Sequence, residues 1–323
     1  MRTPHFAAAS VLILLSAGCG ADTTADTAAA TGDYPVTVSN CGVDVTFTAE
    51  PKRVVMLKSA AVPFLHDLGV MDRVTARAGA YPDAYYDAAT IAELKAVPLL
   101  TDKTDTSGHL QISKEIVISQ QPDLVLGEVD NLSRDTLSAV DIPLLEEPAL
   151  CEQGVPDPSF DDIYEQMQSY GKVFDRGAEA TAAVATLKER MAGIKAVAPG
   201  RTAAVLYPTV GGGVTYAYGK KSMAHPQLAT AGFTDVFGDV DERVFEVTME
   251  ELLGRNPDVL ILLHSDGDPR AVEQAITTLP GAKDLTAVKN GDVMAQLFNF
   301  TEPPSPLSID GLENIVQRFG TGA

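Results

Sequence analysis

Residues 175–199 read DRGAEATAAVATLKERMAGIKAVAP and predict a long α-helix near the middle of the chain. Apolar residues recur here at alternating spacings of four and three, which places them along one face of a helix. These residues are Ala180, Val184, Leu187, Met191, Ile194 and Ala198. Asp175 is the expected N-cap, and Pro199 with Gly200 is expected to end the helix. Such a helix is either a surface element of one large domain or a rod between two domains.

Short apolar segments alternate with helical patterns on both sides of this helix. Continuous apolar runs, such as Val-Val-Met-Leu at 54–57, are typical of parallel strands that are buried on both faces. The expected strands are a short strand-like run at 34–47 and residues 54–57, 74–78, 123–126 and 142–145 before the helix, and residues 203–207, 214–218, 258–263 and 292–297 after it. The expected helices are residues 60–68, 113–121, 159–174, 226–231, 249–255, 269–278 and 308–319. This alternation predicts an α/β fold.

An internal repeat lies on either side of the central helix and favours two domains. Residues 115–126 (EIVISQQPDLVL) align without a gap with residues 250–261 (EELLGRNPDVLI). Each copy predicts a short helix that begins near a glutamate, then a Pro-Asp turn, then a buried strand. We therefore expect two Rossmann-like α/β lobes with mainly parallel sheets, bridged by one long α-helix. The expected segments are an N-terminal lobe (34–158), a helical segment that includes the bridging helix (159–198) and a C-terminal lobe (199–323).

The N-terminal segment is typical of an exported protein with a membrane anchor. Residues 1–19 contain Arg2, an apolar stretch at 7–15 that is too short to span a bilayer, and a final Ser-Ala-Gly-Cys. This ending resembles a bacterial lipobox, in which Cys19 is lipidated and becomes the mature N-terminus; plain secretion is the alternative. Residues 20–33 have no apolar periodicity and are expected to form a flexible tether. We expect the protein to be held by lipid at the outer face of the cytoplasmic membrane.

Export places the two remaining cysteines, Cys41 and Cys151, in an oxidising compartment, where they most simply form one disulfide. Neither cysteine has a second metal ligand at a C-x-x-C or H-x-x-x-H spacing. The net charge of −20 argues against nucleic acid and anionic lipid as electrostatic partners, because these partners require a basic patch.

Several short segments, taken in their order and spacing, resemble the substrate-binding proteins of ABC importers that serve ferric siderophores, haem and cobalamin. In the first lobe they are residues 40–42 (NCG), 51–55 (PKRVV), 68–69 (LG), 72–74 (DRV) and 122–125 (PDLV). In the second lobe they are residues 248–252 (TMEEL), 256–260 (NPDVL) and 287–291 (AVKNG). The resemblance implies a monomer that binds one small molecule between its lobes and delivers it to an ABC permease dimer with its ATPase.

The resemblance also implies one acidic residue in each lobe that docks onto arginines of the permease. By position these residues are Glu115 and Glu250, and helix capping is an alternative role for both. Each lies in the first turn of an expected helix, where the helix dipole favours a carboxylate. The chain departs from many relatives at Val62-Pro63, where they carry a glutamate, and at Met249, where they often carry a tryptophan. Because the chain has no tryptophan, an aromatic platform for a ligand must come from tyrosine or phenylalanine.

Ligands of open α/β lobes bind outside the carboxyl ends of the strands, and two facing lobes turn these ends into a cleft. Residues at the expected strand ends are therefore candidates for ligand binding. They are Lys58, Tyr81, Tyr85, Tyr86 and Glu128 in the first lobe, with Ser59 and Asp130 nearby, and Tyr207, Tyr216, Tyr218, Lys220, His264 and Phe298 in the second lobe. Tyrosine suits a bulky, partly polar ligand, because it offers an apolar face and one hydroxyl.

The sequence contains no motif for catalysis or for an intrinsic cofactor. It lacks the G-x-S-x-G, H-E-x-x-H and G-x-G-x-x-G motifs, and its histidines have no paired metal-ligand spacing. We therefore expect a binding protein and not an enzyme, with an iron(III)–siderophore complex as its ligand. Haem or cobalamin is the alternative ligand, with Tyr81, Tyr218 and His225 as the first candidates for a haem axial ligand. An envelope ligand sensor and a tethered hydrolase are the alternatives from other classes.

Overall fold

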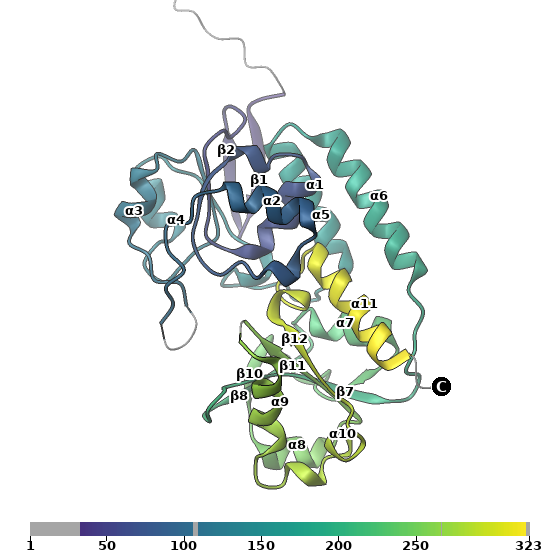
Figure 1. Ribbon diagram of the computed structural model, residues 1–323. Helices are drawn as coiled ribbons and strands as arrows, with labels where there is room; N and C mark the ends of the chain where they lie inside the picture. The colour runs from purple at the N-terminus through teal and green to yellow at the C-terminus, as the bar shows by residue number, and fades with distance from the viewer. Residues whose placement is uncertain (1–32, 106–108, 266, 321–323) are drawn as a thin grey trace, which may run out of the picture. The chain divides into compact units, whose positions relative to one another are not determined.

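Two separate β-sheets, each flanked by helices, carry the fold (Figure 1). The computed structural model of the protein describes residues 33–105, 109–265 and 267–320. The predicted signal segment with Cys19, and the tether up to residue 32, lie outside these residues. Within the described chain, no helix combines the length and apolarity needed to cross a membrane.

The first sheet contains four short parallel strands. Their order is β4 (Val74–Arg77), β3 (Val54–Met56), β5 (Leu124–Leu126) and β6 (Leu144–Leu145). Every residue of β3, β5 and β6 is buried, as expected for strands that are covered on both faces. Val54 and Met56 join one hydrophobic core, and Val55 joins another core on the opposite face. The continuous apolar runs in the sequence therefore reflect two cores, one on each side of the sheet.

The second sheet is mixed. Its order is β10 (Val244–Val247), β8 (Thr215–Tyr218), β7 (Thr202–Pro208), β11 (Val259–His264) and β12 (Val293–Leu297), with β9 (Thr234–Asp235) paired to β7. Strands β7, β11 and β12 are parallel, whereas β8 pairs antiparallel with both β7 and β10. The short Gly211-Gly212-Gly213 turn causes this reversal, because a connection of a few residues can join only antiparallel neighbours. The predicted α/β class is confirmed, and β8 and β10 extend one edge of the parallel strands through antiparallel pairing.

Helices cover both sheets. In the first lobe they are α1 (Val62–Asp67), α2 (Ala88–Ala96), α3 (Lys114–Ser119) and α4 (Arg134–Ser138). In the second lobe they are α7 (Ala224–Ala231), α8 (Met249–Arg255), α9 (Pro269–Thr277), α10 (Thr286–Asn290) and α11 (Pro306–Gly320). The sequence analysis missed α2, α4, α10, β9 and β10, which are short elements without a strong apolar periodicity. The predicted lobe boundaries at 158 and 199 stay a prediction.

A disulfide and several hydrogen bonds, including two from Arg134 to Asn40, fasten a two-stranded antiparallel hairpin, β1 (Val36–Asn40) and β2 (Val43–Phe47), to the first lobe. Cys41 in its turn forms a disulfide with Cys151, which confirms the predicted pairing. Beside it, the Asn40 side-chain amide donates to the backbone oxygen of Glu146 at 2.8 Å and accepts from its backbone N–H at 2.9 Å. The disulfide and the Asn40–Glu146 hydrogen bonds join the hairpin to the segment that follows β6.

Helix α6 (Gly177–Gly193) is the predicted long helix, and it follows α5 (Phe160–Val173). It contacts α5, α1 of the first lobe and α11 of the second lobe, which is the arrangement expected of a bridging helix (Figure 1). The crossing with α5 is close: a Cβ atom on Gly171 would lie only 2.5 Å from the Cβ atom of Ala180. Glycine at position 171 therefore sets how near the two helices can lie.

The predicted ends of this helix are wrong by one residue at the start and by several at the end. Asp175 has a positive φ of 52°, and Arg176 is the N-cap. At the other end, Ile194 is extended, and the backbone N–H of Val197 donates to the Ala231 oxygen at the end of α7 at 2.9 Å. The Val197 N–H thus bonds to α7 and not to a carbonyl within a continued α6, although the apolar spacing favours continuing the helix. Ala198 is consequently buried outside the helix.

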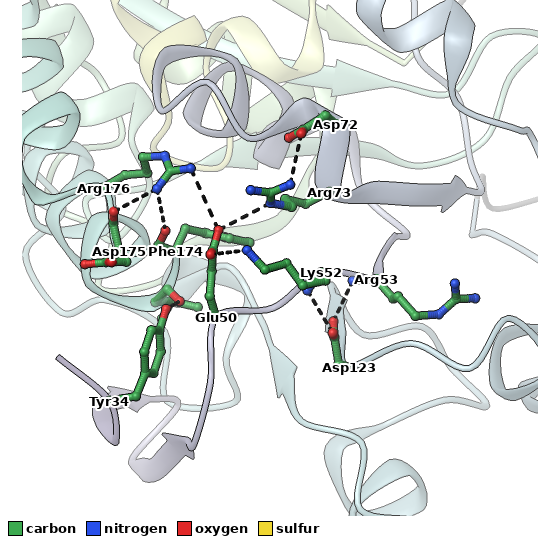
Figure 2. Close-up of polar contacts among 11 residues, drawn as sticks. Tyr34, Glu50, Lys52, Arg53, Asp72, Arg73, Asp123, Phe174, Asp175 and Arg176 are labelled. Atoms are coloured by element: carbon green, nitrogen blue, oxygen red, sulfur yellow. Dashed lines mark hydrogen bonds and ion pairs between the residues drawn. The ribbon is translucent and has the colours of Figure 1, made fainter. Parts of the chain in front are cut away.

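The start of α6 is fastened to the first lobe through Glu50 (Figure 2). The Glu50 carboxylate accepts a hydrogen bond from Arg73 Nε at 3.3 Å, pairs with Lys52, and lies 3.9 Å from the Arg176 guanidinium. Arg176 also donates to the Asp175 oxygen at 3.0 Å. One half-buried carboxylate thus joins three cations from different segments.

The end of α6 is fastened to the second lobe through Arg190. Its guanidinium donates to the Glu313 carboxylate through Nε at 3.1 Å and through a terminal nitrogen at 2.8 Å. A further hydrogen bond reaches Asp310 at 2.5 Å, and both acidic residues belong to α11. Because the guanidinium fork meets a carboxylate with two parallel bonds, this contact fixes orientation as well as distance.

The Pro-Asp step of the internal repeat has the same role in both lobes. The Asp123 carboxylate accepts the backbone N–H groups of Lys52 and Arg53, both at 2.8 Å, just before β3 (Figure 2). The Asp258 carboxylate accepts the backbone N–H of Thr202 at 2.8 Å, at the start of β7. Each aspartate therefore fixes where the neighbouring parallel strand begins. This shared role accounts for the aspartate in both copies of the repeat.

Candidate functional site

A cavity of about 810 Å³ lies where strands of both sheets end. The first lobe contributes residues 79–84, which follow β4, and the second lobe contributes residues 294–297 of β12. Its further lining residues are Arg77, Leu99, Asp102, His264, Gly267, Pro269, Phe300 and Asn314. The volume lies in the range of small-molecule sites, and the position is that of the cleft expected from the sequence.

Two of the predicted ligand residues, Tyr81 and His264, line this cavity. The Tyr81 hydroxyl donates to the backbone oxygens of Met56 and Ala78, both at 3.1 Å. Burial raises the pKa of Tyr81, so the hydroxyl stays protonated at neutral pH. Tyr81 therefore offers the cavity mainly its ring, because its proton is already bound within the first lobe. His264 is buried at the end of β11.

The sequence analysis missed several polar residues of the cavity, including Arg77, Gln296 and Asn314. Arg77 is the last residue of β4, and Gln296 lies within β12. A signal for both was present, because each is a polar residue near the carboxyl end of an expected strand. Asn314 lies on α11, far from any expected strand end, so the rule that selected strand ends could not find it.

Tyr85 joins the two lobes beside the cavity. The backbone N–H of Asn299 donates to the Tyr85 hydroxyl at 2.9 Å, and this hydroxyl lies 3.2 Å from the side-chain oxygen of Asn299. Its ring packs edge-on against Phe300, with 5.1 Å between the ring centroids. Burial raises the pKa of Tyr85. Tyr86 lies next to it, and its hydroxyl donates to the Ser59 oxygen at 3.0 Å. Both tyrosines thus have intraprotein partners.

A second aromatic group lies on the face of β7 and β8. Phe298 packs against Tyr207, at 6.0 Å between the ring centroids, and against Tyr218, at 6.5 Å. Tyr216 pairs with Tyr207 across the two strands and is 37% exposed, whereas Tyr218 is buried, which raises its pKa. None of these residues lines the described cavity. Their predicted contact with the ligand stays a prediction, and Tyr216 is the member with the most open surface.

The predicted charged residues are held by partners of their own. Lys58 Nζ lies 2.6 Å from the Glu146 carboxylate, and its stem passes over Gly127, where a Cβ atom would lie 2.9 Å from the Lys58 Cγ. The Glu128 carboxylate accepts the backbone N–H of Arg134 at 2.9 Å. Lys220 pairs with Asp241 at 3.0 Å, and none of the three predicted residues lines the cavity.

Two adjacent glutamates are buried behind Lys58. The Glu146 carboxylate accepts from Lys58, from the Glu128 backbone N–H at 2.8 Å and from the Glu147 backbone N–H at 2.6 Å. Glu147 is also buried, and its Oε2 atom has no hydrogen-bond partner. Burial, followed by repulsion from Glu146, raises the pKa of Glu147 to about 8, against an opposing effect of Lys58. Glu147 is therefore protonated at neutral pH.

We expect the buried Glu147 carboxyl to make the protein less stable as the pH rises from about 4.5 to about 8. In this window the folded state holds a proton that the unfolded state has lost, so the free energy of unfolding falls by up to about 1.4 kcal/mol per pH unit. Denaturant unfolding of the wild type and of Glu147→Gln measures the effect, because the neutral amide does not titrate. The variant should gain stability relative to the wild type as the pH rises, and parallel pH profiles would contradict this assignment.

Three side chains that could bind a metal lie together at the surface. Ligand atoms of Asp105, His109 and Asp130 lie within 4.8 Å of one another, and all three side chains are exposed. His109 Nδ1 lies 3.4 Å from the Asp130 carboxylate. The histidine spacing in the sequence did not predict this group, because Asp130 follows a different strand.

The two predicted docking glutamates lie in equivalent places. Glu115 is in the first turn of α3, which Ser113 caps, and Glu250 is in the first turn of α8, which Thr248 caps. Both side chains are exposed. Hydrogen bonds from its own backbone N–H and from the Ser113 hydroxyl lower the pKa of Glu115, so this carboxylate is ionised. Neither helix contributes a residue to the cavity.

Comparison with known proteins identifies the family to which this fold belongs. A family model described as "Periplasmic binding protein" matches residues 54–296. A solved structure titled as an ABC-type Fe3+-hydroxamate transport system, from Saccharomonospora viridis, is 58% identical and covers 89% of this chain and 99% of its own, with a TM-score of 0.85.

Two more distant proteins show the breadth of ligands among similar chains. A cobalamin-binding protein of Halobacterium salinarum is 24% identical over 88% of this chain and 74% of its own length. The periplasmic haem-binding protein RhuT from Roseiflexus shares the fold at 18% identity, with a TM-score of 0.64 over 84% of this chain and 98% of its own. The family consists of solute-binding proteins that work outside the cytoplasm with an ABC permease, and it is not a class of enzymes. The chain belongs to the periplasmic binding protein family, as a substrate-binding protein of an ABC importer.

Proposed function

We propose that the protein captures a ferric siderophore of the hydroxamate class between its lobes and delivers it to an ABC permease. The observation that carries this proposal is the 58% identity, over nearly the full length of both chains, to a protein titled as part of an Fe3+-hydroxamate transport system. The cavity of about 810 Å³ supports it, because both lobes contribute aromatic and polar groups to the lining. Such a mixed lining suits a bulky ligand with an apolar body and polar oxygens.

Haem or cobalamin is the second candidate, favoured by the cobalamin-binding relative. The placement of the predicted haem ligands supports it less well. Tyr81 donates its hydroxyl proton to two backbone oxygens, and Tyr218 is buried against Phe298. His225 pairs with Asp235 at 3.0 Å and does not line the cavity. A haem iron would have to compete with these contacts for an axial ligand.

Anchoring and docking complete the proposal. Lipidation at Cys19, followed by the tether, would hold the protein as a monomer at the outer face of the membrane. Glu115 and Glu250, exposed at equivalent helix starts in the two lobes, would then meet basic residues of the permease dimer. Since α6 is fastened at both ends, it would hold the two carboxylates at a fixed separation.

A binding titration tests the ligand. The mature chain is titrated with a ferric trihydroxamate, a ferric triscatecholate, haem and cobalamin, and binding is followed by tyrosine emission, because the chain has no tryptophan. We expect the ferric trihydroxamate to bind most tightly, with a Kd below about 10 μM. Tighter binding of haem or cobalamin would replace the proposed ligand, and no binding by any of the four would reject the proposal.

A further inference from the structure

Arg77 differs from every other arginine in the described residues 33–105, 109–265 and 267–320. Each of the others places a terminal amino nitrogen on a carboxylate or on a carbonyl oxygen of the protein. Arg77 donates only through Nε, to the Val97 oxygen at 3.3 Å. No carboxylate of the described chain lies within ion-pair distance of it. Its two terminal amino groups are therefore available to a ligand.

The Arg77 guanidinium is held in a defined position. Its central carbon lies 5.0 Å from the centroid of the Tyr81 ring, and the Tyr81 hydroxyl is fixed by two backbone oxygens. The Arg77 backbone is fixed as well, because its N–H donates to the Pro98 oxygen at 2.9 Å and its oxygen accepts from Leu100 at 2.8 Å. A guanidinium stacked on an immobile ring loses little freedom when a ligand binds, so more of the interaction appears as affinity.

The surroundings of Arg77 favour an anionic group at this point of the cavity. Arg77 is half-buried, whereas the two acidic lining residues, Asp83 and Asp102, are exposed. Asp83 is also paired with Lys95, at 3.0 Å. Water and salt screen exposed carboxylates more strongly than a half-buried cation, so the field near the guanidinium is positive despite the net charge of −20.

We propose that Arg77 is a specificity-determining residue that binds a carboxylate at the periphery of the cargo, which selects ferric complexes that carry a free acid group. This assignment rests on the proposed function and names its ligand class more closely. The fork of terminal N–H groups matches a carboxylate in a bidentate arrangement, which lysine cannot reproduce. The iron centre itself needs no contact with Arg77, since an outer carboxylate suffices for recognition.

A matched pair of ligands tests this assignment. The probes are a ferric trihydroxamate that carries one free carboxylate and the methyl ester of the same complex. We expect the wild type to bind the acid about tenfold or more tightly than the ester, as for hydrogen bonds between charged partners. Arg77→Met should weaken binding of the acid by a similar factor and binding of the ester by less than about twofold. Arg77→Lys should restore only part of the preference.

Arg255→Met is the matched control, because Arg255 also stacks on an aromatic ring, Phe237 at 4.8 Å, but lies outside the cavity. It should leave the acid-to-ester ratio unchanged. Equal effects of Arg77→Met on both probes, or a wild type without preference for the acid, would overturn the assignment while leaving the proposed function intact. Failure of the wild type to bind either probe would instead reject the proposed function, and this assignment with it.

Discussion

Glu115→Lys combined with Glu250→Lys is expected to abolish uptake while the affinity for the ligand stays unchanged. Both carboxylates are exposed at the starts of α3 and α8, and neither helix reaches the cavity. If they meet arginines of the permease, reversing their charge places like charges together in the docked complex, which costs several kcal/mol. Uptake of iron-loaded siderophore by cells that carry the permease should fall by at least about tenfold for each single variant. Titration of the purified variants measures the affinity separately.

Two neighbouring charge reversals serve as controls. Asp135→Lys changes an exposed acidic residue in the first turn of α4, and Glu251→Lys changes the residue next to Glu250. Both should leave uptake near the wild-type level if docking depends on two defined points and not on the general negative charge. Normal uptake by the double Glu115 and Glu250 variant would rule out the docking role. Loss of ligand affinity in that variant would move these residues into the binding site.

Replacing both Cys41 and Cys151 with serine is expected to lower the free energy of unfolding by about 4–5 kcal/mol. The disulfide closes a loop with a sequence separation of 110 residues, and the chain-entropy model assigns this much to a loop of that length. The loop contains the whole first sheet, so the cross-link restricts the unfolded chain over most of one lobe. Equilibrium unfolding in denaturant, compared between the wild type and the double variant, measures the change.

Reduction of the wild type provides the control for this experiment. Added reductant should bring the wild type close to the double variant and should leave the double variant unchanged. The Asn40–Glu146 hydrogen bonds keep the hairpin attached after the cysteines are lost, so the variant should still fold. A loss of stability below about 1 kcal/mol would mean that the native structure around the disulfide is strained or that the reduced chain stays compact when unfolded.

The short elements next to strong local signals were predictable from the sequence. The Pro-Asp repeat located α3 with β5 and α8 with β11, because a capped helix start, a proline and an apolar run act within about ten residues. The same pattern could not show that Asp123 and Asp258 hold the neighbouring strands in register, since those partners lie about 70 and 56 residues away.

The position of the cavity was predictable from the sequence, but most of its lining residues were not. The ends of parallel strands indicated the position of the cleft, and the cavity lies there. Of the predicted ligand residues, only Tyr81 and His264 line it, because rings such as Tyr207 and Tyr218 pack against Phe298 and Lys58 binds Glu146. Arg77 shows the converse: its residue type is visible in the sequence, but its lack of an internal partner is not.

The central helix shows the same division between local and long-range causes. Residues 175–199 by themselves determined that a long amphipathic helix follows α5, because the apolar spacing is a local property of the chain. Only the tertiary structure decided that the helix ends at Gly193, since Val197 then donates to the end of α7. The tertiary structure also determines how the helix is attached to both lobes. The carboxylates that pair with Arg176 and Arg190 lie more than a hundred residues away along the chain. Such partners depend on how the whole chain folds, and no local pattern contains them.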